Sequence, residues 1–127
     1  MKKFLPFILV LFFFNARAQN FSGGGGAITD NLQPTSFPLV IQGLANRLDS
    51  SFGIQQICFN ISHSRANDLE IKLESPDGSV ITLASRLGNA TSQNFSSTCF
   101  RGNSPNSIRT APAPFTGTYR PFEMLGA

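Results

Sequence analysis

The sequence predicts an all-β fold, an antiparallel β-sandwich, and three observations carry that prediction. Apolar and polar residues alternate strictly over 57–62 and again over 68–74, which is the period of strands that bury one face. A Ser-Pro-Asp-Gly turn follows at 75–78. No window after residue 18 shows convincing helical periodicity, and that part of the chain is rich in Ser, Thr, Asn, Gly and Pro, as expected where many short strands need many turns.

The first alternation predicts a strand whose buried face carries Ile57, Phe59 and Ile61. An earlier strand is expected over 37–45, where Pro38 restricts it to a sheet edge or lies near its start. The segment 111–127 contains three prolines and is expected to be a loop.

The second alternation, the turn that follows it and the partner strand after the turn predict a β-hairpin over 68–85. Leu69, Ile71 and Leu73 form its apolar face, and charged residues alternate with them. Pro76 fixes φ at the second turn position, and Gly78 accepts the unusual exit geometry. Because a slip of one residue would exchange the buried and solvent faces, the register is strongly set.

The beginning of the chain predicts export. Lys2 and Lys3 precede an apolar stretch over 4–14, and Ala16-Arg17-Ala18 supplies a small-x-small cleavage signal. This order is typical of a secretory signal peptide, and the stretch is too short to span a bilayer. We therefore expect a signal peptide over 1–18, then a Gly-rich linker over 19–27, and a secreted or cell-surface protein without a membrane span. The alternative is a buried N-terminal helix.

Removal of that signal peptide would neutralise the chain. The formal charge of +3 comes from ten basic and seven acidic residues. Lys2, Lys3 and Arg17 belong to the signal, and every acidic residue lies after it, so the exported charge is zero. The high isoelectric point therefore gives no reason to expect a nucleic-acid partner. What remains is enough for one small domain.

Several segments resemble the P domain found beside the protease domain in kexin-like proprotein convertases. The main one is 61–78, Ile-Ser-His-Ser-Arg-Ala-Asn-Asp-Leu-Glu-Ile-Lys-Leu-Glu-Ser-Pro-Asp-Gly. Asn94-Phe95 and Phe100 resemble the family's next strand, and 113–121 is similar to a segment of P domains in secreted bacterial proteins. The resemblance covers 28–127. It implies a jelly-roll-like sandwich and a module without catalytic machinery of its own.

The chain departs from the family pattern at both ends. In the convertases a subtilisin-like protease domain precedes the P domain, whereas here the signal peptide leads almost directly into it. The family usually ends with a Gly-x-Trp-x-Leu-x-Val-x-Asp strand, but this chain ends at Ala127 and has no Trp. We therefore expect a P domain over 28–127 that lacks its final strand or strands.

The residues that could carry catalysis do not form a recognisable set. His63 is the single histidine, and Asp68 lies five residues after it. No Gly-x-Ser-x-Gly elbow supplies a nucleophile, and no orienting group can be assigned. One histidine and two well-separated cysteines also do not match zinc-ligand spacing. We therefore expect no catalytic residue and no zinc, and we interpret His63 as a polar residue at a strand end.

Calcium is the one cofactor that the sequence leaves open. Asp30, Asp68 and Asp77 fall at turns or strand ends, where carboxylates can gather with backbone carbonyls. No EF-hand loop is present. The alternative is structural, since Asp77 has a sufficient role in its turn. These three carboxylates are the candidate metal ligands.

Cys58 and Cys99 are predicted to form a disulfide, because two cysteines lie in predicted strands of a secreted domain. Cys58 alternates with Ile57 and Phe59, so it lies outside the core. The alternative is two separate thiols that act as small hydrophobes.

Four Asn-x-Ser/Thr patterns are glycan acceptors only in a eukaryotic secreted protein; they begin at Asn20, Asn60, Asn89 and Asn94. The Lys-Lys signal and the resemblance to bacterial modules favour a bacterial source, in which these patterns are incidental.

Two functions follow from these predictions. In the first, the chain is a non-catalytic interaction or adhesion module of a larger extracellular protein, and its partners are other domains of that protein. In the second, it is an accessory domain that stabilises or targets a subtilisin-like serine endopeptidase located elsewhere, and its partner is that protease domain. Position in the chain favours the first function, and family association favours the second.

Overall fold

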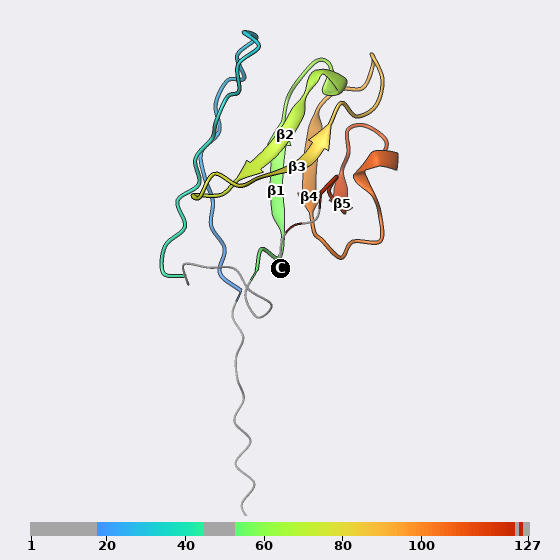
Figure 1. Cartoon of the computed structure of the whole chain (residues 1–127). Coiled ribbons are helices and arrows are strands. Elements are labelled where there is room, and N and C mark those ends of the chain that lie inside the picture. The colour runs from blue at the N-terminus through green and yellow to red at the C-terminus, as the bar shows by residue number, and fades with distance from the viewer. Residues whose placement is uncertain (1–17, 45–52, 124, 126–127) are drawn as a thin grey trace, which may run out of the picture. The chain divides into compact units, whose positions relative to one another are not determined.

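The computed structural model describes residues 18–44, 53–123 and 125. The chain divides into two compact units, Met1–Leu44 and Ala45–Ala127. All strands of the described residues lie in the second unit, and Figure 1 labels them β1 to β5. Their bounds are β1 Ile57–Ile61, β2 Glu70–Glu74, β3 Val80–Ser85, β4 Phe95–Phe100 and β5 Gly117–Tyr119. Short 3₁₀ turns at Ala66–Asp68 and Ile108–Thr110 are the only helical elements of the described part.

The strands form two small sheets. The first has the order β1-β4-β5, with β1 antiparallel to β4 and β5 parallel to β4. The prediction of purely antiparallel sheets is therefore wrong at β5. The physical reason is the connection over 101–116, which is long enough for the crossover of about a dozen residues that a parallel pair requires.

The three-residue strand β5 also corrects the prediction that 111–127 is a loop throughout. Its Gly-Thr-Tyr sequence lies between Pro114 and Pro121, so no proline occupies a ladder position. Beyond Tyr119, the Arg120 backbone N–H donates to the Asn106 carbonyl at 2.6 Å, and the Ile108 N–H donates to the Arg120 carbonyl at 3.1 Å. The loop before the second 3₁₀ turn thus covers the outer edge of β5.

The second sheet is the β2–β3 hairpin, which confirms the hairpin predicted over 68–85. Glu74 pairs with Val80, and a register shift between Ile71 and Lys72 leaves Leu83 as an extra residue. The Leu83 carbonyl accepts from the Phe122 N–H at 3.0 Å. The Glu123 N–H donates to the Thr82 carbonyl at 3.0 Å. Two residues near the C-terminus therefore hydrogen-bond to β3 without forming a further strand.

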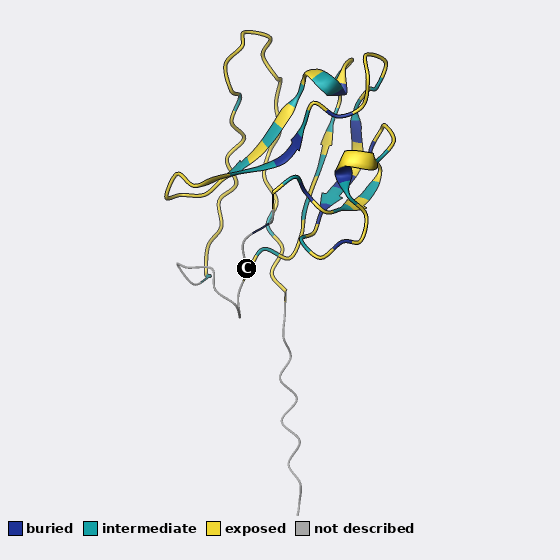
Figure 2. Ribbon diagram, turned by 45° about the vertical axis from the view of Figure 1, so that its right-hand side comes forward, coloured by how far each residue is buried: buried dark blue, intermediate teal, exposed yellow. Residues whose placement is uncertain are grey.

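The core of the second unit is built from phenylalanines of β4 and of the loop before β5. Phe95, Phe100 and Phe115 are at most 1 % exposed. The rings of Phe95 and Phe115 stack with their centroids 4.7 Å apart. Thr98 is fully buried among them, and its hydroxyl donates to the Phe115 carbonyl at 2.8 Å. Figure 2 shows the buried residues on β3 and β4.

The predicted apolar faces point toward this core but are only half-buried. Their residues pack against the core cluster and include Ile57, Phe59, Ile61, Leu69, Ile71 and Leu73. The all-β prediction is confirmed as a mostly β chain with two small sheets, and within the described residues these sheets do not close into a barrel. The jelly-roll arrangement and the lack of final strands stay predictions.

The strand predicted over 37–45 is wrong for its described residues. Positions 37–44 form no ladder, because Pro38 removes a donor and the segment pairs with no strand of the described chain. The same unit contains a polar turn in which Asn31 Oδ1 accepts from the Gln33 N–H at 3.1 Å. The signal-peptide prediction lies outside the described residues except for Ala18. Among the residues described, none belongs to a helix of the length and apolarity that a bilayer span requires.

Candidate functional site

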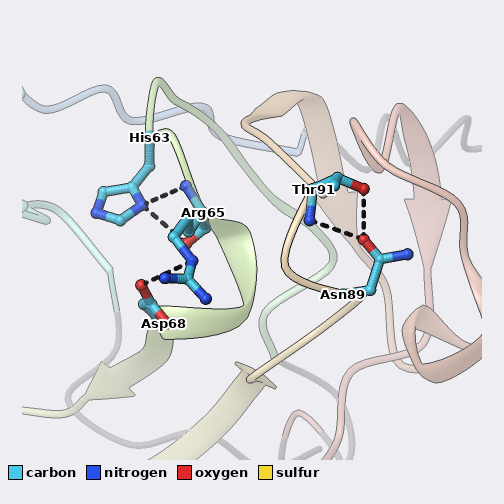
Figure 3. Close-up of polar contacts among 5 residues, drawn as sticks. All are labelled: His63, Arg65, Asp68, Asn89 and Thr91. Carbon is cyan, nitrogen blue, oxygen red and sulfur yellow. Dashed lines mark hydrogen bonds and ion pairs between the residues drawn. The ribbon is translucent and has the colours of Figure 1, made fainter.

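His63 lies in the loop after β1, and its backbone ties that loop to the start of β4. The His63 N–H donates to Asn94 Oδ1 at 2.9 Å, and the Asn94 N–H donates to the His63 carbonyl at 3.0 Å. The imidazole Nδ1 lies 3.1 Å from the Arg65 backbone nitrogen and 2.8 Å from the Arg65 carbonyl oxygen. Figure 3 shows the ring turned onto this backbone. With Nδ1 unprotonated it accepts from the N–H, and with Nδ1 protonated it donates to the carbonyl.

Asp68 faces Arg65 rather than the imidazole. Its Oδ2 lies 3.6 Å from Arg65 Nε, and both side chains are about half exposed, at 54 % and 53 %. An ion pair this exposed contributes about 0–1 kcal/mol. Among the described residues, no carboxylate and no serine hydroxyl hydrogen-bonds the His63 ring. The geometry gives His63 a structural role and does not assemble the base and orienter of a hydrolase triad.

The three candidate metal ligands come from separate segments of the chain. Asp68 precedes β2 and Asp77 follows it, so they lie at opposite ends of one strand. Asp30 lies in an exposed bend of the first unit. Within 18–44, 53–123 and 125, no three His, Cys, Asp or Glu side chains gather closely enough to hold a metal ion. No calcium site is therefore assigned to these residues.

Asp77 instead organises the turn between β2 and β3. Its Oδ1 accepts from the Ser75 hydroxyl and, at 2.9 Å, from the Ser79 N–H. The Ser75 hydroxyl is the largest cause that lowers the pKa of Asp77 to about 2, and the Ser79 backbone is the next. Gly78 adopts φ +86° in the same turn. The sequence interpretation of Ser-Pro-Asp-Gly as a turn with a structural aspartate agrees with these contacts.

A second polar loop, Gly88–Ser92, lies before β4 and was not recognised in the sequence. Asn89 Oδ1 accepts from the Thr91 N–H at 2.9 Å and from the Thr91 hydroxyl at 2.7 Å, as Figure 3 shows. The Asn89 N–H donates to Ser92 Oγ at 2.9 Å. The Ser92 carbonyl accepts from the Ala66 N–H at 2.8 Å, which fastens this loop to the 3₁₀ turn after His63. The Asn-x-Thr pattern at Asn89 thus has a structural role as a turn.

The two cysteines meet across the first sheet. Cys58 of β1 and Cys99 of β4 are direct partners in the antiparallel register, and a disulfide joins them. Cys58 is exposed and Cys99 is half-buried. The bridge therefore lies on the face of β1 that points away from Phe59 and the phenylalanine core.

An open polar recess lies at the end of the first sheet, near the junction of β4 with its following loop. Its volume is about 430 Å³, and it is lined by Gln56, Arg101, Asn103, Ser104, Pro105, Asn106 and Thr118. The Ser104 hydroxyl donates to the Thr118 carbonyl at 3.0 Å, and the Arg101 N–H donates to the Tyr119 carbonyl at 2.9 Å. These bonds fix the recess against β5. Sequence reasoning missed it, because its residues come from three separate segments.

Comparison with protein-family models matches residues 55–117 to the proprotein convertase P-domain. The match runs from just before β1 to the first residue of β5, so it includes the His63 loop, the hairpin and both cysteines. Neither the curated proteins nor the solved structures gave a significant match. The P-domain is a non-catalytic domain of the convertases. Residues 55–117 of this chain belong to the proprotein convertase P-domain family.

Proposed function

We propose that the chain is a non-catalytic interaction module of a larger secreted or surface-attached protein. The observation that carries the proposal is the P-domain match over 55–117, because this domain is an accessory part of the proteins in which it occurs. The hydrogen bonds of His63 support it, since the imidazole Nδ1 is engaged by the backbone of its own loop. These bonds stabilise the loop, and among the described residues no hydroxyl hydrogen-bonds the ring as a nucleophile would.

The compartment supports the same proposal. The Cys58–Cys99 disulfide and the P-domain together suggest a protein of the secretory pathway. Disulfides persist in oxidising compartments and are rare in the cytosol. A signal peptide over 1–18 is part of the proposal, and the mass of the exported chain tests it. A mature N-terminus at Gln19 is the expected result, and retention of Met1 in exported protein would contradict it.

A second candidate function is that of an accessory domain for a subtilisin-like serine endopeptidase that lies elsewhere. The same family match favours it, because a P-domain implies association with a protease domain. In this case the partner surface serves to stabilise or target the enzyme. The two candidates share the fold and the lack of a catalytic role, and they differ in the partner.

Capture from the medium of the source organism separates the two candidates. The tagged chain is recovered from culture medium, and the associated proteins are identified by mass spectrometry and labelled with a fluorophosphonate probe for active serine hydrolases. A labelled subtilisin-like protease that binds the native chain, but not the reduced and alkylated chain, would establish the accessory role. Specific partners without protease labelling are the result expected for the interaction module. Recovery of the same proteins by native and alkylated chain alike would contradict both.

A further inference from the structure

The charges of the second unit are separated along the chain. Positions 78–122 contain four arginines and no Asp, Glu or Lys. Asp68, Glu70, Glu74 and Asp77 lie on and around β2. Two of them have cationic partners, in the pairs Arg65–Asp68 and Lys72–Glu70. The loops around β4 and β5 therefore carry an excess of positive charge, and Glu123, three residues after Arg120, is the first acidic residue that follows them in sequence.

Two of these four arginines have partners for their side chains. The Arg109 guanidinium lies 3.7 Å above the centre of the Phe122 ring, and Arg120 Nη1 donates to the Ser104 carbonyl at 3.4 Å. The Arg101 guanidinium, like that of Arg86, has no hydrogen-bond or ion-pair partner among the residues that the structure describes. Its backbone, however, is fixed by the bond to the Tyr119 carbonyl at the end of β4. The Arg101 side chain is thus a solvated cation beside the recess, and its backbone is held in place.

The lining of the recess suits a carboxylate. Its lining residues include, besides Arg101, three with side-chain amides, Gln56, Asn103 and Asn106, and Thr118 with a hydroxyl. The Gln56 amide nitrogen donates to Cys58 Sγ at 3.1 Å. Among the described residues, none that lines the recess is acidic. The planar guanidinium offers paired N–H donors that match the two oxygens of a carboxylate, and such charge-assisted bonds are about twice as strong as neutral ones. Its volume of about 430 Å³ is within the range of roughly 300–1,000 Å³ that is usual for ligand pockets.

We propose that the recess beside Arg101 binds an aspartate or glutamate side chain of an acidic peptide segment in a partner protein. A sulfated polysaccharide fits less well, because such polyanions are held by several free cations in a row, whereas the lining offers one guanidinium among amides. The inference rests on the proposed function in naming a partner class for an interaction module. The module can act through another surface, so the inference can fail while the proposed function stands.

The test uses the purified full chain and a fluorescein-labelled hexa-aspartate peptide, with hexa-asparagine as the neutral control. Fluorescence anisotropy at low ionic strength should show saturable binding of hexa-aspartate that weakens as salt is added. Arg101→Gln should weaken the affinity about tenfold, as expected for the loss of one charge-assisted contact. Arg101→Lys keeps the positive charge but lacks the paired N–H donors of the guanidinium, and it should give an intermediate affinity. Arg86→Gln is the matched control, because it removes one arginine that does not line the recess, and it should bind nearly as tightly as the unaltered chain.

Three results would overturn the inference. One is the absence of saturable binding to hexa-aspartate. Another is an equal loss in Arg101→Gln and Arg86→Gln, which would show that net charge and not the recess attracts the peptide. The third is tighter binding of a heparin oligosaccharide that both variants weaken alike. Unchanged circular dichroism of the variants establishes that each still folds. A chain that fails these tests but still captures specific partners from the medium loses only this inference.

Discussion

Cys58 and Cys99 face each other across the β1–β4 ladder with their Cα atoms 4.1 Å apart, and the disulfide between them joins positions 41 residues apart in sequence. A covalent loop of this size stabilises the folded state by roughly 4 kcal/mol in the chain-entropy model. The double variant Cys58→Ala/Cys99→Ala should therefore lose stability of about that size in urea unfolding. Because both cysteines lie on the outer face of the sheet, lost packing adds little to the loss of stability in the double variant. An unchanged midpoint in the double variant would show that the bridge contributes no stability.

The buried hydroxyl of Thr98 predicts a second stability effect. It donates to the Phe115 carbonyl at 2.8 Å inside the phenylalanine core. Thr98→Val keeps the side-chain shape but removes the donor, and should cost about 1–3 kcal/mol because a buried acceptor loses its partner. Thr118→Val is the control, since Thr118 is an exposed residue of β5, and should change stability by less than about 0.5 kcal/mol. Equal unfolding midpoints for the two variants would refute the role of this bond.

Gly88 and Gly78 allow a matched test of the loop before β4. Both have positive φ, +77° and +86°, so alanine costs about 1–2 kcal/mol at either position. At Gly88 an added Cβ would also lie 2.2 Å from Ser92 Oγ, whereas at Gly78 it meets nothing within 4 Å. Gly88→Ala should therefore be less stable than Gly78→Ala by roughly 2 kcal/mol, as is typical of overpacking. Thermal unfolding measures the difference, and equal losses would show that Ser92 moves away without cost.

Asp77 predicts how the hairpin turn responds to acid. Its folded pKa of about 2 lies below the ordinary value of 3.8, so its contribution to stability is present above about pH 4 and is lost as the pH falls toward 2. The unaltered chain should thus exceed Asp77→Ala in melting temperature at pH 5, and this advantage should shrink near pH 2. Ser75→Ala removes the largest cause of the shift and should raise the pKa of Asp77, as measured by NMR of its carboxyl carbon. A titration midpoint near 4 in the unaltered chain would contradict the account.

Local patterns were sufficient to predict part of this fold. The alternation around Phe59 and the turn at Asp77 each depend on residues close in sequence, and both appear as predicted. The parallel pairing of β5 depends on the packing of Phe115 and on a long connection after β4, and neither leaves a periodic signal. A strand of three residues is too short to show alternation. The segment at Pro38 had apolar residues but forms no ladder, because β-forming residues need a partner strand.

The candidate site could likewise be predicted only in part. The alternation predicts where the strand before His63 ends, and His63 lies two residues after β1. The recess beside Arg101 combines residues from before β1, from after β4 and from β5. Because these segments are far apart in sequence, no single motif predicts the recess. The sequence signal that could have pointed to the recess is the absence of acidic residues over 78–122.

We expect this P-domain chain to act without catalysis of its own, and an assay of peptide-bond hydrolysis tests this expectation. The purified chain is incubated with casein and with dibasic peptide substrates, and the products are followed by mass spectrometry beside a His63→Ala variant. Because no serine hydroxyl and no carboxylate of the described residues hydrogen-bonds the His63 ring, we expect no cleavage above the buffer control for either protein. Cleavage by the unaltered chain that His63→Ala abolishes would contradict it.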